Sequence, residues 1–229
     1  MKISYLFYTL KDLSDIAKGN EFLYIMQQYG LVIDKASSYE PINKDFEVMN
    51  LVNMWKTNEN GGMPSSCCFL FKGKKFTGMV SWHINLYPHT KAFNGIYLTL
   101  TVPKTYSTNS LIQLGDDIFI WSGAVYGFIS EESKEASGNL HLGIPGLMWI
   151  NYFGPEYTNE SDFHTPSNHV FVGNGIRFNL VEIPNDKRLD DLAFIQSIKD
   201  EIGDLWFFKE PIKSNRRVPV FDKSEITIR

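Results

Sequence analysis

Cysteine is scarce in this 229-residue chain, where Cys67 and Cys68 are the only two and stand side by side. Neighbouring cysteines rarely form a disulfide, because the ring they would close is strained. Both lie in an apolar run, so we expect buried, reduced thiols. The lack of a disulfide framework fits a reducing compartment.

Long hydrophobic runs are also missing. No segment approaches the roughly 18 consecutive apolar residues that a membrane-spanning helix needs. The N-terminal residues Met1 to Tyr5 do not begin the ordered charged, apolar and small-residue regions of a signal peptide. We therefore expect no membrane contact and a cytoplasmic location.

Positive charge is in short supply. The chain has 22 basic and 26 acidic residues, a formal net charge of −4, whereas general nucleic-acid binders usually carry a basic excess. The tight basic clusters, Lys72 with Lys74 and Lys75 and Arg216 with Arg217, are typical of a solvated turn and tail. We expect no nucleic-acid partner. The mild acidity favours a partner that carries positive charge.

Motifs with a known chemistry are absent as well. The sequence holds no nucleophile-elbow serine motif, no P-loop and no dinucleotide-binding glycine pattern. His164 and His169 lie five positions apart in a predicted loop without a third ligand, which argues against a zinc site. We predict no metal, no cofactor and no catalytic residue, although distant residues can assemble a catalytic site that no motif announces.

Aromatic residues are abundant, at 14% of the chain, and are densest between Gly143 and Tyr157. Glycine and proline punctuate both ends of this stretch, and large apolar side chains fill it. So many large side chains favour burial against much of the fold. We predict that it is the central packing element and that Trp149 is buried.

Helical periodicity predicts four main helices, in which large apolar side chains recur every three or four residues. Gly30 and Gly203 follow two of them, where a helix-ending glycine belongs. The first predicted helix is 20–29, with Asn20 as its cap, and the third is 107–125. The second runs from Asn43 or Asp45 to Trp55 and has Val48, Leu51 and Val52 on its apolar face. The fourth is capped by Asn185 or Asp186, and its apolar face consists of Leu192, Ile195, Ile198 and Ile202.

Alternating or short apolar runs predict strands between these helices. They are 3–10, 31–33, 67–71, 76–85, 95–102, 128–130, 170–172, 176–183 and 206–208. Residues 34–43 are predicted to be a loop, and the runs at 67–71 and 76–85 a hairpin. Helices and hairpin-connected strands together predict an α+β fold, with a mostly antiparallel sheet packed by about four helices.

The length suits a single domain, 1–229. A strand followed by a helix both opens the chain, at 3–29, and recurs at 176–202. This echo leaves open two pseudo-repeated lobes, 1–104 and 105–229.

Acidic residues in the middle of the chain are the candidate partner contacts. Asp116 and Asp117 stand on the predicted long helix, and Glu131, Glu132 and Glu135 follow the strand predicted at 128–130. Because they flank that strand, they could share one rim facing a basic partner. The alternative is that they are solvated faces with structural roles.

The stretch Gly143-Ile-Pro-Gly-Leu-Met-Trp-Ile-Asn-Tyr-Phe-Gly154 resembles a segment of bacterial immunity proteins from polymorphic and type VI toxin systems, in particular the immunity family numbered 52. Further features agree in order: Tyr39-Glu-Pro-Ile42, Trp55, Phe71-Lys-Gly-Lys74, Trp82, Glu182-Ile-Pro184, Phe207-Phe208 and Val218-Pro-Val-Phe221. The resemblance implies a cytosolic α+β protein that binds and neutralises a cognate toxin without catalysis, and it transfers no toxin-contacting residue.

Two other functions stay open at this point. A phage- or defence-associated protein of the same fold could bind another protein, or a nucleotide signal through a stacking pocket of aromatic residues. An unrecognised hydrolase is the third hypothesis.

Overall fold

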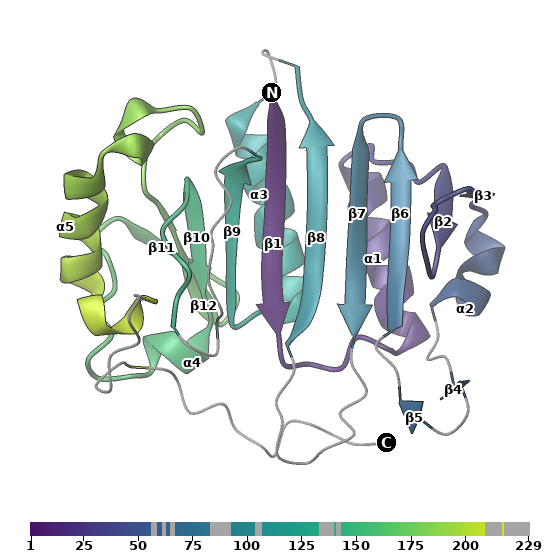
Figure 1. Cartoon of the computed structure of the whole chain (residues 1–229), viewed down its shortest axis with the longest axis horizontal. Coiled ribbons are helices and arrows are strands. Elements are labelled where there is room, and N and C mark those ends of the chain that lie inside the picture. The colour runs from purple at the N-terminus through teal and green to yellow at the C-terminus, as the bar shows by residue number, and fades with distance from the viewer. Residues whose placement is uncertain are drawn as a thin grey trace.

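The computed structural model describes residues 1–55, 59–60, 63–64, 67–82, 93–103, 107–132, 140, 143–208 and 217, with 59–60 and 63–64 as backbone. Its main element is a ten-stranded sheet whose neighbouring strands are all antiparallel (Figure 1). The strand order is β11 (His169–Val172), β12 (Gly175–Asn179), β10 (Ile150–Phe153), β9 (Tyr126–Glu131), β1 (Lys2–Thr9), β8 (Asn94–Thr101), β7 (Phe76–Trp82), β6 (Cys67–Gly73), β2 (Lys35–Ser37) and β3 (Lys44–Asp45). A two-stranded sheet pairs β4 (Glu59–Asn60) with β5 (Met63–Pro64).

Helices are interspersed with these strands, which confirms the predicted α+β class. In Figure 1, α1 and α3 lie behind the sheet and α5 lies at its β11 end. The described helices are α1 (Ile16–Gln28), η1 (Val48–Asn50), α2 (Leu51–Met54), α3 (Thr108–Ser122), α4 (Pro155–Thr158), η3 (Lys187–Asp190), α5 (Leu192–Ile202) and η4 (Asp204–Trp206), where η denotes a 3₁₀ helix.

One core lies between the sheet and the helices α1 and α3. Side chains of a strand alternate between its faces, so Ile3, Tyr5 and Phe7 of β1 all point to this side and are fully buried. The Tyr5 hydroxyl donates to the carbonyl oxygen of Leu111 in α3 at 3.1 Å. The central strand is thereby fixed to the helix that covers it.

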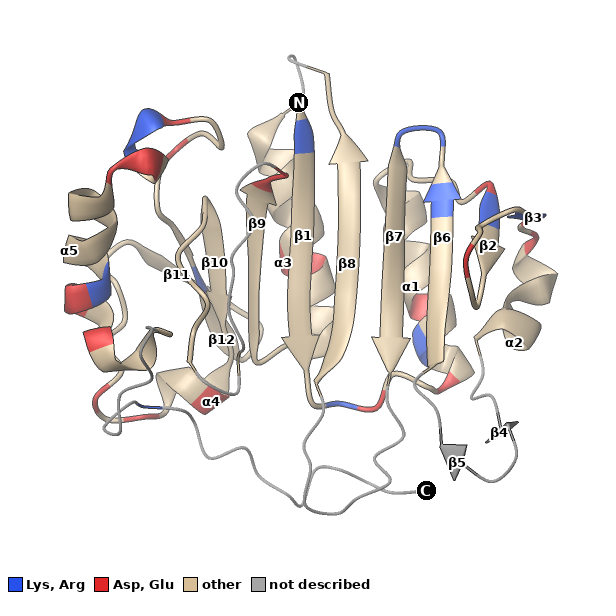
Figure 2. Cartoon of the chain, viewed as in Figure 1, with Lys and Arg blue, Asp and Glu red and all other residues tan. Residues whose placement is uncertain are grey.

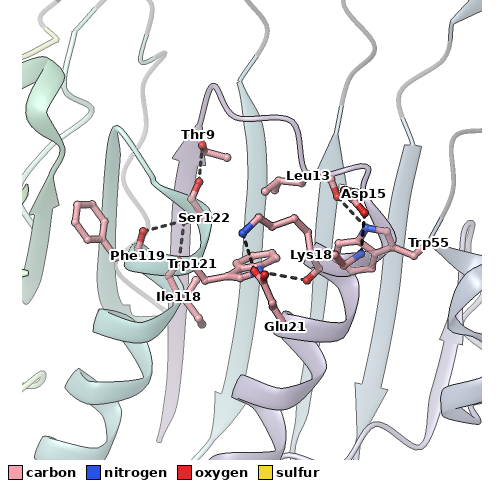
Figure 3. Close-up of polar contacts among 11 residues, drawn as sticks. Thr9, Leu13, Asp15, Lys18, Glu21, Trp55, Ile118, Phe119, Trp121 and Ser122 are labelled. Atoms are coloured by element: carbon pink, nitrogen blue, oxygen red, sulfur yellow. Dashed lines mark hydrogen bonds and ion pairs between the residues drawn. The ribbon is translucent and has the colours of Figure 1, made fainter. Parts of the chain in front are cut away.

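Polar contacts join the ends of these elements (Figure 3). Thr9 at the end of β1 donates its hydroxyl to the Ser122 carbonyl at 2.8 Å, at the end of α3. The Trp121 indole donates to the Lys18 carbonyl at 3.2 Å, which links α3 to α1. The Trp55 indole donates to the Leu13 carbonyl at 2.8 Å and so ties the segment after α2 to the loop before α1.

A second core lies on the opposite face, at the β9–β10–β12 side of the sheet. Tyr126 and Phe128 of β9 are buried there together with Phe153 of β10. The Phe153 ring lies 5.0 Å from that of Phe163, which in turn lies 5.8 Å from Trp206. Aromatic pairs at such spacings add to the burial energy.

The stretch 143–157 contributes to both cores, which confirms its predicted packing role. Trp149 is 1% exposed and belongs to the core under the helices, as does Tyr152. Ile144 and Phe153 belong to the second core. The stretch therefore fastens both layers to one sheet.

Two helix starts differ from the sequence prediction. Helix α1 begins at Ile16, one turn before Asn20, because the Asp15 carboxylate caps it by accepting from the backbone of Ala17 at 2.9 Å. Asp191 caps α5 by accepting from the backbone of Ala193 at 3.0 Å, whereas Asp186 caps the short η3 before it. The expected end at Gly30 is confirmed, since its φ of +69° lies in the left-handed region.

The predicted apolar faces are only partly buried. Leu51 is buried, but Val48 and Val52 are exposed, because the segment forms one 3₁₀ turn and one α turn rather than a longer helix. In α5, Ile202 is buried, while Leu192 at the first position is 81% exposed.

Several strand predictions need correction. Residues 31–33 are not a strand; the nearest is β2, which lies with β3 in the segment predicted as a loop. Residues 206–208 are the end of η4 followed by a single bridge from Phe207 to Ile144. The predicted hairpin is confirmed as β6 and β7, and β7 ends at Trp82, beyond which 83–85 lie outside the described residues.

Candidate interaction surface

Asp116 and Asp117 of α3 are both engaged inside the molecule. The Asp116 carboxylate pairs with the Arg177 guanidinium of β12 at 2.5 Å and accepts the Tyr152 hydroxyl at 3.0 Å. The Asp117 carboxylate accepts the hydroxyl of Tyr29, the residue that follows α1, at 2.7 Å. Their described bonds therefore run to α1 on one side and to the sheet on the other.

Burial raises the pKa of Asp116, an effect larger than the opposing one of the Arg177 charge and the two hydrogen bonds. Burial and the neighbouring Asp116 charge also raise the pKa of Tyr152 well above its ordinary value, so its hydroxyl stays a donor. This cluster fastens α3 to β10 and β12. Its chemistry is that of a structural ion pair.

The glutamates occupy a different part of the molecule. Glu131 ends β9, and Glu132 follows it and pairs with Lys2 of β1 at 3.0 Å. The Lys2 side chain is 55% exposed and that of Glu132 is 37% exposed, so solvent screens this pair and it contributes little to stability. Glu135 lies outside the described residues. A shared rim with the two aspartates is not evident from these contacts, and partner binding by the glutamates stays a prediction.

The front of the sheet at β6, β7 and β8 is the surface that the sequence analysis did not single out. Figure 1 shows no described helix in front of these three strands. Their outward-pointing residues are half-buried or exposed, except Thr99, which is 7% exposed. We call the following set the open face: Cys68, Leu70, Lys72, Thr77, Met79, Ser81, Gly95 and Tyr97.

An apolar row crosses the middle of the open face. Leu70 pairs with Met79, and Met79 pairs with Tyr97, in consecutive antiparallel registers. These three side chains belong to neither of the two cores, although cross-strand neighbours of this kind normally pack. On β1, the next strand, the same side of the sheet becomes buried, since Ser4 is 2% exposed.

Hydroxyl groups and one charge frame this row. The Thr99 hydroxyl donates to that of Tyr97 at 2.9 Å, and the Ser81 hydroxyl donates to the Gly95 carbonyl at 3.3 Å. Lys72 is the single charged residue of the open face, and Figure 2 shows further basic residues at the adjoining β6–β7 turn. A nearly uncharged, flat and partly apolar surface is suited to protein contact.

One pattern in the sequence does indicate this surface. In β7 the alternation of Thr77, Met79 and Ser81 against buried Val80 and Trp82 marks one solvated face. What the sequence could not show is that neighbouring β6 and β8 would align their own partly apolar residues beside it.

The two cysteines are free thiols, and they differ in burial. Cys67 is buried, as predicted, but the same prediction is wrong for Cys68, which is half-buried and whose thiol donates to the Ser38 carbonyl at 3.2 Å. Burial raises the pKa of Cys68. Among the described residues, no group of three or more His, Cys, Asp or Glu side chains is arranged to hold a metal ion.

No described helix is both long enough and apolar enough to cross a membrane.

Comparison with known proteins places the fold. No protein-family model matches the chain, and no curated protein matches it. Among solved structures, the chain is similar to Pseudomonas aeruginosa T6SS protein PA0821, with a TM-score of 0.55 and 11% sequence identity. The match covers 87% of this chain and 72% of that one, so the two share a fold over most of their lengths.

Proposed function

We propose that this protein is an immunity-type protein of a type VI or related toxin system, which binds a cognate toxin and neutralises it without catalysis. The observation that carries the proposal is the fold shared with a T6SS protein over 87% of the chain. The sequence resemblance to immunity proteins of type VI systems, reached from different features, adds the immunity role to this proposal.

The open face is the surface we assign to the toxin. Its apolar row, Leu70, Met79 and Tyr97, contributes to neither core, so it can be covered by a partner without disturbing the fold. Residues of this kind, an aromatic group with Met and Leu beside it, are typical of the centres of protein interfaces. The exposed Lys2 and Glu132 lie at one end of β1, where they can affect the rate of association.

Co-expression with the toxin encoded by the neighbouring gene tests this proposal. The wild-type protein should restore growth, and Met79→Glu should lose protection, because an unpaired carboxylate would be desolvated at the contact. Tyr24→Glu is the matched control, since Tyr24 is 63% exposed on α1, behind the sheet. Failure of the wild type to protect would contradict the function, whereas equal protection by both variants would contradict only the assigned surface.

Charge reversal tests the predicted role of the glutamates. Glu131→Lys with Glu132→Lys should slow association at low salt and matter less at high salt, where screening shortens the reach of charge. Folding stability should change by about 0.5 kcal/mol or less, as for most surface substitutions. An association rate insensitive to both changes would remove these residues from the contact surface.

A further inference from the structure

The two edges of the ten-stranded sheet are protected very differently. β3 is two residues long, and Lys44 and Asp45 place charge on it. β11 has four residues, His-Val-Phe-Val, and no Asp, Glu, Lys or Arg occurs between His169 and Ile176. Natural sheets usually blunt their edges with charge, proline or shortness. β11 carries no proline and no Asp, Glu, Lys or Arg, and its four residues make it longer than the two-residue β3.

Apolar side chains are exposed on both sides of this edge. Phe171 is 79% exposed, and Val170, which points to the opposite face, is also exposed. Ile120 of α3 is exposed and lies beside the β11–β12 turn, since a side chain on Gly173 would contact it at 3.2 Å. Among the residues that the structure describes, the edge thus presents an apolar margin around a strand with no partner strand on its outer side.

The backbone at Phe171 is free to pair outward. β11 and β12 are joined by a two-residue turn, so the flanking Val172 and Gly175 form a hydrogen-bonded pair. Pairs alternate along an antiparallel ladder, so Phe171 and Ile176 form a non-hydrogen-bonded pair. The N–H and C=O groups of Phe171 therefore point away from β12. The His169 N–H also points outward but bonds to the Pro166 carbonyl at 3.1 Å.

We propose that β11 pairs antiparallel with β11 of a second copy of this chain, about a two-fold axis that passes between the two Phe171 residues. In this register each Phe171 exchanges both backbone hydrogen bonds with its copy. The His169 carbonyl accepts from Gly173 across the axis, so the N–H already used by Pro166 is not needed. No Asp, Glu, Lys or Arg of β11 faces its copy, and the two exposed phenyl rings become cross-strand neighbours.

The size of the contact sets its strength. A four-residue strand pair buries less than the roughly 1,200–2,000 Å² of a typical stable interface, so we expect a dissociation constant on the order of 100 µM. The dimer would be an isologous one, because both copies contribute the same strand. It uses the edge of the sheet and leaves the open face of β6, β7 and β8 to another partner.

Sedimentation analysis from about 1 µM to about 1 mM protein, which brackets that expected constant, tests the proposal. The wild type should move from monomer to dimer, and Phe171→Lys should stay monomeric. Val52→Lys is the matched control, because Val52 is 61% exposed on α2, at the opposite end of the sheet in Figure 1, and this variant should still dimerise. Thermal melts of both variants should match the wild type, which separates loss of pairing from loss of folding.

Cross-linking tests the register. In a Cys68→Ser background, Phe171→Cys should oxidise to a covalent dimer, because hydrogen-bonded antiparallel residues have Cα atoms about 5.5 Å apart, within disulfide range. Val52→Cys, at the opposite end of the sheet, should cross-link at least ten-fold more slowly. A wild type that stays monomeric throughout, dimerisation that survives Phe171→Lys, or equal cross-linking of both cysteine variants would overturn the proposal. So would a monomer whose toxin complex alone is lost in Phe171→Lys, which would assign the edge to the toxin.

Discussion

Replacing buried tryptophans by phenylalanine should separate packing from hydrogen bonding in this fold. Trp149 is 1% exposed, and its indole Nε1 has no hydrogen-bond partner in the described part of the chain. Trp55 is equally buried, but its indole donates to the carbonyl of the fully buried Leu13 at 2.8 Å. The two residues share their chemistry and burial. They differ in this hydrogen bond and in the ring contacts that Trp55 makes with Phe22, Phe69 and Trp82.

The magnitudes follow from that difference. Either substitution to Phe removes part of a bicyclic ring from a packed core, at a cost of about 1–2 kcal/mol for the lost contacts. Trp55→Phe also leaves the Leu13 carbonyl without this donor, which adds about 1–3 kcal/mol. Trp149→Phe loses no such bond. We therefore expect Trp55→Phe to lower the free energy of unfolding by at least about 1 kcal/mol more.

Thermal unfolding measures this difference. In a domain of this size, 1 kcal/mol corresponds to a shift in melting temperature of about 2–4 °C. Trp149→Ala should destabilise the fold far more than Trp149→Phe does, by lowering the free energy of unfolding by about 3–5 kcal/mol, and it should express poorly. The reasoning would be refuted if Trp149→Phe were as destabilising as Trp55→Phe, or if Trp149→Ala melted like the wild type.

Three further predictions follow from other contacts. Because burial raises the pKa of Asp116, the folded state holds that proton more tightly than the unfolded chain, so this group's contribution to stability falls as pH rises from the ordinary to the raised pKa. Removing its partner in Arg177→Met should therefore cost more in denaturant titrations at about pH 7 than at about pH 4, and an equal cost would contradict the assignment. Gly127→Ala should prevent correct folding, since the added Cβ would overlap the Phe7 ring, and a soluble variant with native circular dichroism would show otherwise. Cys67 in the native protein should react with a thiol reagent far more slowly than after unfolding, and rapid native labelling would show that the strand opens.

Periodicity predicted most of the elements and their class because each depends on nearby residues. The alternation at 95–102 and the helical stripe at 107–125 are local patterns, and β8 and α3 follow them closely. The capping residue of α1 was harder to predict, because Asp15 and Asn20 are both good N-terminal capping residues. The structure uses Asp15, whose earlier position adds a further turn of helix to α1.

Long-range pairing could not be predicted in the same way. The exposure of Val48 and Val52 depends on how short the helix becomes beside β3, and the sequence pattern alone favours a longer one. The bond between Asp116 and Arg177 joins residues on α3 and β12, and nothing local links them. The open face likewise arises only because three separate strands align their registers.

Calorimetric titration of the purified protein with the toxin encoded by the neighbouring gene tests the central claim most directly. The account predicts a stoichiometric complex that is weakened at least ten-fold by Met79→Glu and is unchanged by Tyr24→Glu. A wild-type protein that gives no heat of binding and no complex with that toxin would contradict it.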